Sequence, residues 1–226
     1  MLRAVIFDFD GVIVDSERAH FEMFRRVLAE EGVPLTWEQY YGRYLAMDDK
    51  GCFTAVLSDR GIAADASKVS ELVRRKSRYY SEHAQGSLEM IPGSVELLDA
   101  LRREGIPAAI ASGALRNEIE HVLDVRGLRG HFSVIVSAED CSAGKPDPEP
   151  FLKAMDALSR EVPGLRAPEC LVVEDSLHGI AAAKKAGMKC LAVATSYPVG
   201  QLGEADMAVE SLVGISVSVL RSLFAE

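Results

Sequence analysis

The sequence contains no long hydrophobic run. A membrane-spanning helix needs roughly 18 consecutive apolar residues, and no stretch of the 226 residues approaches that length. The apolar run at the N-terminus is interrupted at Asp8, which argues against the hydrophobic region of a signal peptide. We therefore expect a cytoplasmic protein that has no membrane partner.

Closely spaced cysteines are also missing. The four cysteines lie far apart, and none forms a Cys-x-x-Cys pair, so neither a zinc site nor a thiol redox motif is indicated. This usage favours reduced and mostly buried thiols over disulfides. The four positions are Cys52, Cys141, Cys170 and Cys190.

The chain also lacks a basic stripe. It has 25 Lys and Arg against 34 Asp and Glu, a formal net charge of -9. Residues 16–88 hold 11 of each sign, so the remainder of the chain carries the whole negative charge. An acidic protein without a basic cluster is not expected to bind nucleic acid.

Short apolar segments alternate with helical patterns along most of the chain. Such alternation is typical of βαβ units, and it predicts an α/β fold with a Rossmann-like, doubly wound parallel sheet. The predicted strands are 2–7, 107–111, 133–136, 170–173 and 189–194, and the predicted helices are 94–104, 115–125, 149–159 and 177–186.

Residues 16–88 break this alternation, because they contain helical patterns only. The predicted helices are 17–31, 36–44, 50–60 and 67–84, the second with Thr36 as its N-cap. We therefore predict two domains: an α/β core of residues 1–15 and 89–226, and an all-helical cap of residues 16–88. A bundle inserted directly after the first strand is expected over the carboxyl end of the sheet.

Polar residues follow each predicted strand, at the edge where parallel sheets bind ligands. The first strand runs into Asp8 and Asp10, two carboxylates that repel each other unless a cation or a division of catalytic roles keeps them together. Carboxylates from separate strands would supply the hard oxygen ligands that Mg²⁺ prefers, beside a Lys and a Ser suited to an anion. The remaining strand-end residues are Ser112, Gly113, Lys145, Glu174 and Asp175.

Four motifs in this order resemble the haloacid dehalogenase superfamily, and they span nearly the full length. They are Asp-x-Asp-Gly-x-x-x-Asp-Ser from Asp8, the Ser112 that ends the second motif, Lys-Pro-x-Pro from Lys145, and Glu-Asp-Ser-x-x-Gly-Ile-x-Ala-Ala-x-x-Ala-Gly from Glu174. The helical insert resembles that superfamily's cap. The most similar branch is the one shared by β-phosphoglucomutase and small phosphomonoester phosphatases.

The resemblance implies a Mg²⁺-dependent phosphatase that acts on a small phosphorylated metabolite. Asp8 would be the nucleophile that forms an aspartyl phosphate, and Asp10 the general acid and base. The implied metal site consists of Asp8, the backbone carbonyl of Asp10, Glu174 and Asp175. The implied phosphate-binding residues are Ser112, Gly113 and Lys145.

Three residues of the insert are candidates for contact with substrate. His20 lies one helical turn after Ser16 and is typical of a packed or surface residue; because relatives of the mutase type place a His similarly, the alternative is a role in the hinge or in a proton relay. Lys76 belongs to the run 74–78, most simply a solvated helix face, and alternatively a contact for an anionic substrate. Arg43 lies in the stretch 40–49, which is either a substrate-facing loop or packed aromatic core.

Alternative functions remain open from the sequence. True dehalogenases generally lack the second Asp of the first motif, so Asp10 argues against dehalogenation. β-Phosphoglucomutases carry an Arg in a cap loop where residues 45–49 here include Asp48 and Asp49, which favours hydrolase over mutase. A phosphorylated switch would need neither Asp10 nor a cap. The oligomeric state cannot be read from the sequence.

Overall fold

The structure of the protein is a computed structural model. It describes residues 1–45 and 47–225, without the side chains at positions 81 and 83–87. The chain divides into two compact units. One comprises Met1–Asp15 with Glu89–Glu226, and the other comprises Ser16–Leu88. Within the described residues, no helix is both long and apolar enough to cross a membrane.

The first unit is built on a six-stranded sheet in the order β5-β4-β1-β6-β7-β8, and every neighbouring pair in it is parallel. The predicted α/β class is therefore confirmed. The strands are β1 Ala4–Phe7, β4 Ala108–Ala111, β5 Phe132–Val136, β6 Cys170–Glu174, β7 Lys189–Val193 and β8 Met207–Val209.

The central strands are apolar on both faces, as expected for a parallel sheet covered on both sides. On β1, Ile6 belongs to the core cluster that contains Phe151, whereas Phe7 points to the other face and meets Phe132 edge to face at 6.1 Å between ring centroids. Small side chains such as Ala109 and Ala111 on the face of Phe151 allow the covering helices to approach closely.

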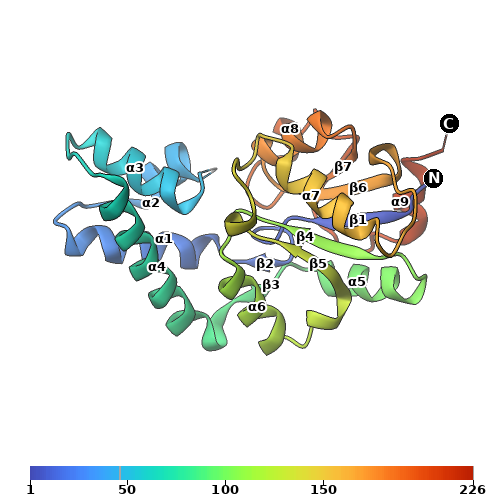
Figure 1. The fold of residues 1–226 in the computed structure, drawn as a ribbon, viewed down its shortest axis with the longest axis horizontal. Coiled ribbons are helices and arrows are strands. Elements are labelled where there is room, and N and C mark those ends of the chain that lie inside the picture. The colour runs from blue at the N-terminus through green and yellow to red at the C-terminus, as the bar shows by residue number, and fades with distance from the viewer. Residues whose placement is uncertain (46, 226) are drawn as a thin grey trace. The chain divides into compact units, whose positions relative to one another are not determined.

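Helices cover both faces of this sheet (Figure 1): α7 and α8 lie on one side, and α5 and α6 on the other. Glycines with left-handed backbone close several turns of this unit, among them Gly11 between β1 and β2 and Gly93 before α5. The helices are α5 Ser94–Arg103, α6 Arg116–Val125, α7 Glu149–Leu158, α8 Leu177–Lys185 and α9 Val217–Ser222. Short 3₁₀ segments are Arg129–His131, Ala138–Asp140, Ala167–Glu169 and Val199–Gln201.

A two-stranded antiparallel ribbon marks the two places where the chain passes between the units. It pairs β2, Val14–Asp15, with β3, Glu89–Met90. The ribbon was not predicted, because each strand has only two residues and alternation cannot be recognised over so short a length.

The second unit consists of helices. They are α1 Glu17–Glu30, α2 Trp37–Gln39, the π-helical segment η1 Tyr40–Tyr44, α3 Asp49–Asp59 and α4 Ala66–Ser87. Thr36 is the N-cap of α2: its Oγ1 accepts the Gln39 N–H at 3.3 Å, and Gln39 Oε1 accepts the Thr36 N–H at 3.2 Å. The prediction of one regular helix over 36–44 was wrong, because the backbone widens into a π-turn at Tyr40.

Two further elements were missed near the C-terminus. Strand β8 has three half-buried residues, and α9 has six, so both are too short for a periodic pattern to stand out from the surrounding loops. Tertiary contacts hold both elements in place: β8 pairs with β7, and α9 packs against α5. Ser216 caps α9 by accepting the Val219 N–H at 3.4 Å.

Replacing Phe151 tests the packing of α7 on the sheet. Its side chain is fully buried, so Phe151→Ala leaves a cavity and should lower the free energy of unfolding by about 3–5 kcal/mol. Urea denaturation measures the change. Val125→Ala, at a position with 52% exposure, is the control and should change it by less than about 0.5 kcal/mol. Equal effects of the two substitutions would contradict the assigned core.

Candidate active site

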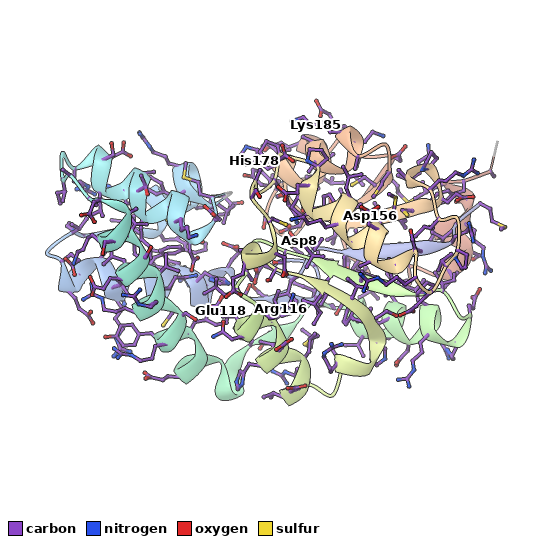
Figure 2. All side chains as sticks on the ribbon, viewed as in Figure 1. Asp8, Arg116, Glu118, Asp156, His178 and Lys185 are labelled. Carbon is purple, nitrogen blue, oxygen red and sulfur yellow. The ribbon has the colours of Figure 1, made fainter. Side chains whose placement is uncertain are left out.

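Three neighbouring strands bring polar residues to the carboxyl edge of the sheet. Asp8 follows β1, Ser112 follows β4 and Glu174 ends β6. Strand β1 lies between the other two, with Phe7 in register with Ile110 on one side and Val173 on the other. Parallel pairing therefore places Asp8 between the ends of both neighbouring strands, at the edge where the sequence predicted that these residues converge. Figure 2 labels Asp8 at this edge.

Lys145 joins the two carboxylates. Its Nζ lies 2.8 Å from Asp8 Oδ2 and 2.6 Å from Glu174 Oε1, and the Glu174 side chain is fully buried. The same ammonium lies 4.9 Å from the centre of the Phe151 ring. A buried pair of carboxylates needs such a shared cation, because neither charge is solvated by water.

The second oxygen of Glu174 is held by the chain that follows it. Glu174 Oε2 accepts the N–H groups of Asp175 at 2.8 Å and Ser176 at 2.7 Å, and the Ser176 hydroxyl at 3.0 Å. Gly179 of α8 packs directly over this carboxylate: a Cβ there would lie 1.7 Å from Glu174 Oε1. The rotamer of Glu174 is therefore fixed from both sides.

Burial and charge move the pKa values of this triad apart. Burial raises the pKa of Asp8 well above its ordinary value, and the nearby Glu174 raises it further, although Lys145 opposes both. For Glu174, burial raises the pKa, but the charge of Lys145 and the hydrogen bonds from Lys145 and the Ser176 backbone together outweigh it and lower the pKa. The two carboxylates raise the pKa of Lys145 against the effect of burial. Lys145 is thus charged. Further positive charge near Asp8 would favour the ionised form of the Asp8 carboxyl group.

The donor set of this site suits Mg²⁺. Asp8, Glu174 and Asp175 each offer one carboxylate oxygen, and these three atoms lie within 4.8 Å of one another. All three donors are hard oxygens, the type that Mg²⁺ prefers. The carboxyl group of Asp10 does not belong to this group of atoms among the described residues.

Asp10 lies in a tight turn between β1 and β2. The Phe9 carbonyl accepts the N–H groups of Ile13 at 2.8 Å and Val14 at 3.2 Å, and the Gly11 N–H reaches the Val14 carbonyl at 2.8 Å. Gly11 has φ +74°, and a Cβ there would lie 2.0 Å from Asp175 Oδ2. Only glycine fits this close approach, which brings the first and fourth motifs into contact.

Ser112 and Gly113 form the turn between β4 and α6. Ser112 is buried, its N–H reaches the Val136 carbonyl at 3.0 Å, and its Oγ accepts the Ala114 N–H at 3.0 Å. Gly113 is exposed, with no atom within 4 Å of a Cβ placed on it. The turn thus leaves open space at Gly113.

The loop that carries Lys145 is held at two points. The Glu149 carboxylate accepts the N–H groups of Ser142 at 3.0 Å and Ala143 at 2.8 Å. Lys185 of α8 donates to the Pro146 carbonyl at 2.9 Å. These bonds fix the backbone on both sides of Lys145. Glu149 and Lys185 were not predicted as residues of the site.

Thr195 and Ser196 were also missed. They follow β7 at the same edge, so the strand-end rule that found the other residues would have found them too. Thr195 Oγ1 donates to the Gly11 carbonyl at 2.6 Å and lies 3.2 Å from Asp175 Oδ2. The Ser196 hydroxyl donates to the same Asp175 oxygen.

Two of the three candidate residues of the helical unit form a buried cluster. Lys76 has no exposed surface; its Nζ lies 2.5 Å from Asp49 Oδ1 and 2.7 Å from His20 Nδ1, and 4.5 Å from the Phe24 ring centre. The His20 ring stacks on Tyr80 at 4.5 Å. The interpretation of Lys76 as part of a solvated helix face was therefore wrong, because a charged partner on α3 compensates its burial.

Arg43 and the aromatic residues around it are part of the unit's own packing. Arg43 Nη2 lies 2.5 Å from Asp59 Oδ1, and the Tyr44 hydroxyl donates to the same carboxylate at 2.6 Å. Tyr40 and Tyr44 are buried, as the core-packing interpretation of residues 40–49 expects. Ala46, in the same stretch, lies outside the described residues.

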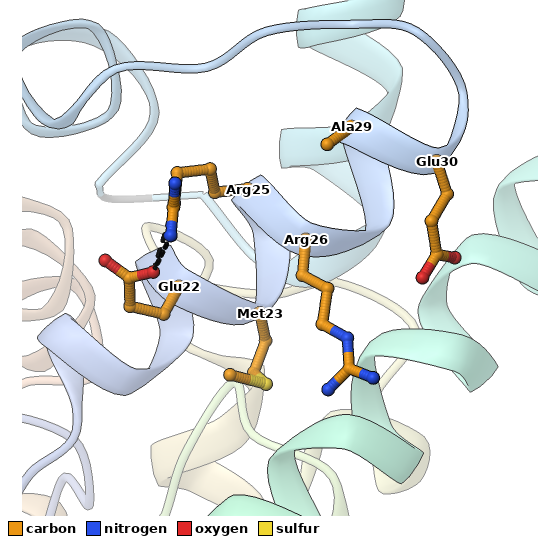
Figure 3. A pocket seen from close by; sticks show the side chains of 6 residues that line it. All are labelled: Glu22, Met23, Arg25, Arg26, Ala29 and Glu30. Atoms are coloured by element: carbon orange, nitrogen blue, oxygen red, sulfur yellow. Dashed lines mark hydrogen bonds and ion pairs between the residues drawn. The ribbon is translucent and has the colours of Figure 1, made fainter.

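A groove on α1 is separate from all of these predicted residues (Figure 3). Its lining includes an ion pair between Arg25 and Glu22 at 2.6 Å. The Arg26 guanidinium lies 3.6 Å from the centre of the Tyr79 ring. These contacts are those of a charged helix surface. The lining residues are Glu22, Met23, Arg25, Arg26, Ala29 and Glu30.

The chain is similar in sequence to a family of known proteins. A model of haloacid dehalogenase-like hydrolases matches residues 5–193. Validoxylamine A 7′-phosphate phosphatase from Streptomyces hygroscopicus subsp. limoneus is 28% identical over 95% of this chain and 96% of its own.

Two solved structures share the fold. CbbY from Rhodobacter sphaeroides, in complex with xylulose 1,5-bisphosphate, has a TM-score of 0.88 at 22% identity and covers 97% of this chain and 99% of its own. β-Phosphoglucomutase from Clostridium difficile has a TM-score of 0.87 at 22% identity and covers 99% and 97%. At this identity the likeness establishes the fold alone.

Glu149 gives the Lys145 loop a pH-dependent anchor. Bonds from Lys153, Ser142 and Ala143 lower the pKa of Glu149 from 4.5 to about 2. A carboxyl group whose pKa is lower in the folded than in the unfolded state stabilises the fold at pH values above its unfolded pKa. This contribution is lost as the pH falls from about 4.5 towards 2. Glu149→Gln should therefore lower Tm at pH 7, and the difference from the wild type should shrink below pH 4.5.

Thermal denaturation between pH 7 and pH 3 measures this difference. Glu204→Gln, at an exposed position, is the matched control and should leave Tm nearly unchanged throughout. A Tm difference for Glu149→Gln that stays constant with pH would contradict the ionic anchor.

Proposed function

Because the chain belongs to the haloacid dehalogenase-like hydrolase family and is an enzyme of the phosphomonoester hydrolase class, we propose that it is a Mg²⁺-dependent phosphatase that works through an aspartyl phosphate on Asp8. The observation that carries the proposal is the bridge of Lys145 between Asp8 and Glu174, with a carboxylate oxygen of Asp175 within 4.8 Å of an oxygen of each. This arrangement combines a nucleophile, a fixed cation and an oxygen site for a metal.

In the first half-reaction, a carboxylate oxygen of Asp8 attacks phosphorus and the bond from phosphorus to the ester oxygen breaks. The departing alkoxide takes a proton from the carboxyl group of Asp10. Lys145, together with Ser112 and the backbone at Gly113, stabilises the charge on the phosphoryl oxygens.

In the second half-reaction, Asp10, now a carboxylate, removes a proton from water. The water oxygen attacks phosphorus, the bond to Asp8 breaks, and phosphate leaves. Mg²⁺, held by Asp8, Glu174, Asp175 and the Asp10 carbonyl, would supply positive charge that favours ionised Asp8 and offsets the charge of the phosphoryl group.

We propose that residues 1–15 and 89–226 carry the chemistry and that the helical unit, residues 16–88, acts as a cap that selects the rest of the substrate. The phosphatase related to this chain is named for a phosphorylated small molecule, which supports a small phosphorylated metabolite as substrate. His20 and Lys76 stay candidates for substrate contact. Arg43 also stays a candidate: Asp59 pairs with it, as Asp49 pairs with Lys76.

A β-phosphoglucomutase-type mutase is the alternative within the same fold. A mutase must hold a second phosphate in its cap, and here Asp49 instead contributes a negative charge beside Lys76. Because Asp49 already neutralises the charge of the buried Lys76, this lysine is less suited to hold a second phosphate, and hydrolysis is favoured. A non-catalytic phospho-Asp switch is a more distant alternative, and it gives no role to Asp10.

Phosphate release from a panel of esters tests the proposal. With Mg²⁺, p-nitrophenyl phosphate, hexose 6-phosphates, β-glucose 1-phosphate and phosphoglycolate are assayed in parallel. Release should depend on Mg²⁺, stop with EDTA and vanish in Asp8→Asn, and Asp10→Asn should lower kcat for alkyl esters by about 10²–10⁴-fold. Asp156→Asn, at an exposed position on α7, is the matched control. Release that survives Asp8→Asn would contradict the assigned nucleophile.

A coupled assay separates hydrolase from mutase. β-Glucose 1-phosphate supplied with a trace of glucose 1,6-bisphosphate should yield phosphate and no glucose 6-phosphate. The measurement follows NADPH from a glucose 6-phosphate dehydrogenase coupling step. Formation of glucose 6-phosphate faster than phosphate would support the mutase instead.

A further inference from the structure

We propose that Thr195 and Ser196 are positioning residues that hold Asp175 and the Gly11 backbone in the arrangement that binds the divalent cation. This inference rests on the metal site of the proposed function. The two hydroxyls follow β7, one strand beyond the strand that carries Glu174, at the same edge of the sheet. They offer no acidic ligand themselves, so their role would act through Asp175 and Gly11.

Each hydroxyl has a distinct acceptor. Thr195 Oγ1 is 2.6 Å from the Gly11 carbonyl and 3.2 Å from Asp175 Oδ2. A hydroxyl has one proton, so Thr195 gives it to the nearer Gly11 carbonyl. The Ser196 hydroxyl donates to Asp175 Oδ2. Thr195 therefore fixes the loop of the first motif, and Ser196 fixes the carboxylate of the fourth.

The packing makes these two bonds depend on each other. A Cβ on Gly11 would lie 2.0 Å from Asp175 Oδ2 and 3.3 Å from Thr195 Oγ1, so the loop, the carboxylate and the hydroxyl are in contact. A carboxylate with one oxygen fixed can present the other in few directions. The Gly11 carbonyl that accepts from Thr195 lies in the peptide that directly follows the one containing the Asp10 carbonyl, the carbonyl assigned to the metal.

Burial explains why hydroxyls are needed at this point. Asp175 is 4% exposed and Ser196 is 8% exposed, so water cannot replace a lost donor without entering the core. Outer donors that orient a metal-binding carboxylate typically change metal affinity by 10–100-fold when they are removed. A donor that only satisfies a buried carboxylate would change stability and leave metal affinity the same.

Metal binding without substrate distinguishes these two roles. Mn²⁺ is titrated into the full-length protein, and free Mn²⁺ is followed by electron paramagnetic resonance, which needs no turnover. Thr195→Val and Ser196→Ala should each raise the Kd for Mn²⁺ by about 10–100-fold. Thr195→Ser keeps the hydroxyl and should stay within about threefold of the wild type.

Ser159→Ala is the matched control. Its hydroxyl donates to the Met155 carbonyl at 3.0 Å at the end of α7, and its removal should leave the Kd unchanged. Thermal denaturation of each variant confirms that it folds. If Thr195→Val or Ser196→Ala lowers Tm but binds Mn²⁺ as the wild type does, the positioning role is overturned.

Asp175→Asn separates this inference from the proposed metal site. If the wild type binds Mn²⁺ and Asp175→Asn does not, the metal site stands, and the two hydroxyl variants alone decide the positioning role. If Asp175→Asn binds Mn²⁺ as tightly as the wild type, the metal assignment fails, and the positioning role is overturned with it.

Discussion

The site depends on one constraint: two carboxylates at a buried sheet edge share a single ammonium. Asp8 and Glu174 end neighbouring strands, and parallel pairing places them together whatever their charge. Lys145 makes this arrangement tolerable, with contacts of 2.8 and 2.6 Å. Burial still raises the pKa of Asp8, so one lysine does not fully compensate the two acids. The local chemistry thus favours a second cation, which is the role that we propose for Mg²⁺.

The surrounding elements keep this charged group rigid. Gly179 packs over Glu174, Glu149 and Lys185 hold the loop of Lys145, and Gly11 presses against Asp175. Gly179 and Lys185 lie on α8, Glu149 begins α7, and Gly11 lies in the turn after β1. The first unit therefore acts as a frame in which short, individually weak bonds fix three loops against one another, and this preorganisation is what electrostatic catalysis requires.

The sequence predicted the parts of this frame that have long patterns or specific motifs. Five strands and the helices between them were recognisable from alternation, and Asp8, Lys145 and Glu174 from their places after strands and from the family motifs. Strand β8, helix α9 and the β2–β3 ribbon have six residues or fewer per element, and tertiary pairing, not propensity, decides such short segments.

Side-chain partners were harder to predict than elements. Lys76 lies in a basic run, and nothing within that run indicates that it is buried in an ion pair with Asp49 on another helix. The strand-end rule points to Thr195 and Ser196 as well, but hydroxyls after a strand are common, and their partners Gly11 and Asp175 are seen only in the structure. Periodicity reports which face of an element is apolar, but it does not report which polar groups meet across elements.

The covalent intermediate on Asp8 is the most direct test of this account. Asp10→Asn is mixed with p-nitrophenyl phosphate and Mg²⁺, quenched in acid and digested for mass spectrometry. Because p-nitrophenolate leaves without a proton, the first half-reaction should proceed while hydrolysis is slowed, and phosphate should accumulate on the peptide that contains Asp8. Release of p-nitrophenol with no phosphate on Asp8, or with phosphate on another residue, would contradict the assignment of Asp8 as the nucleophile.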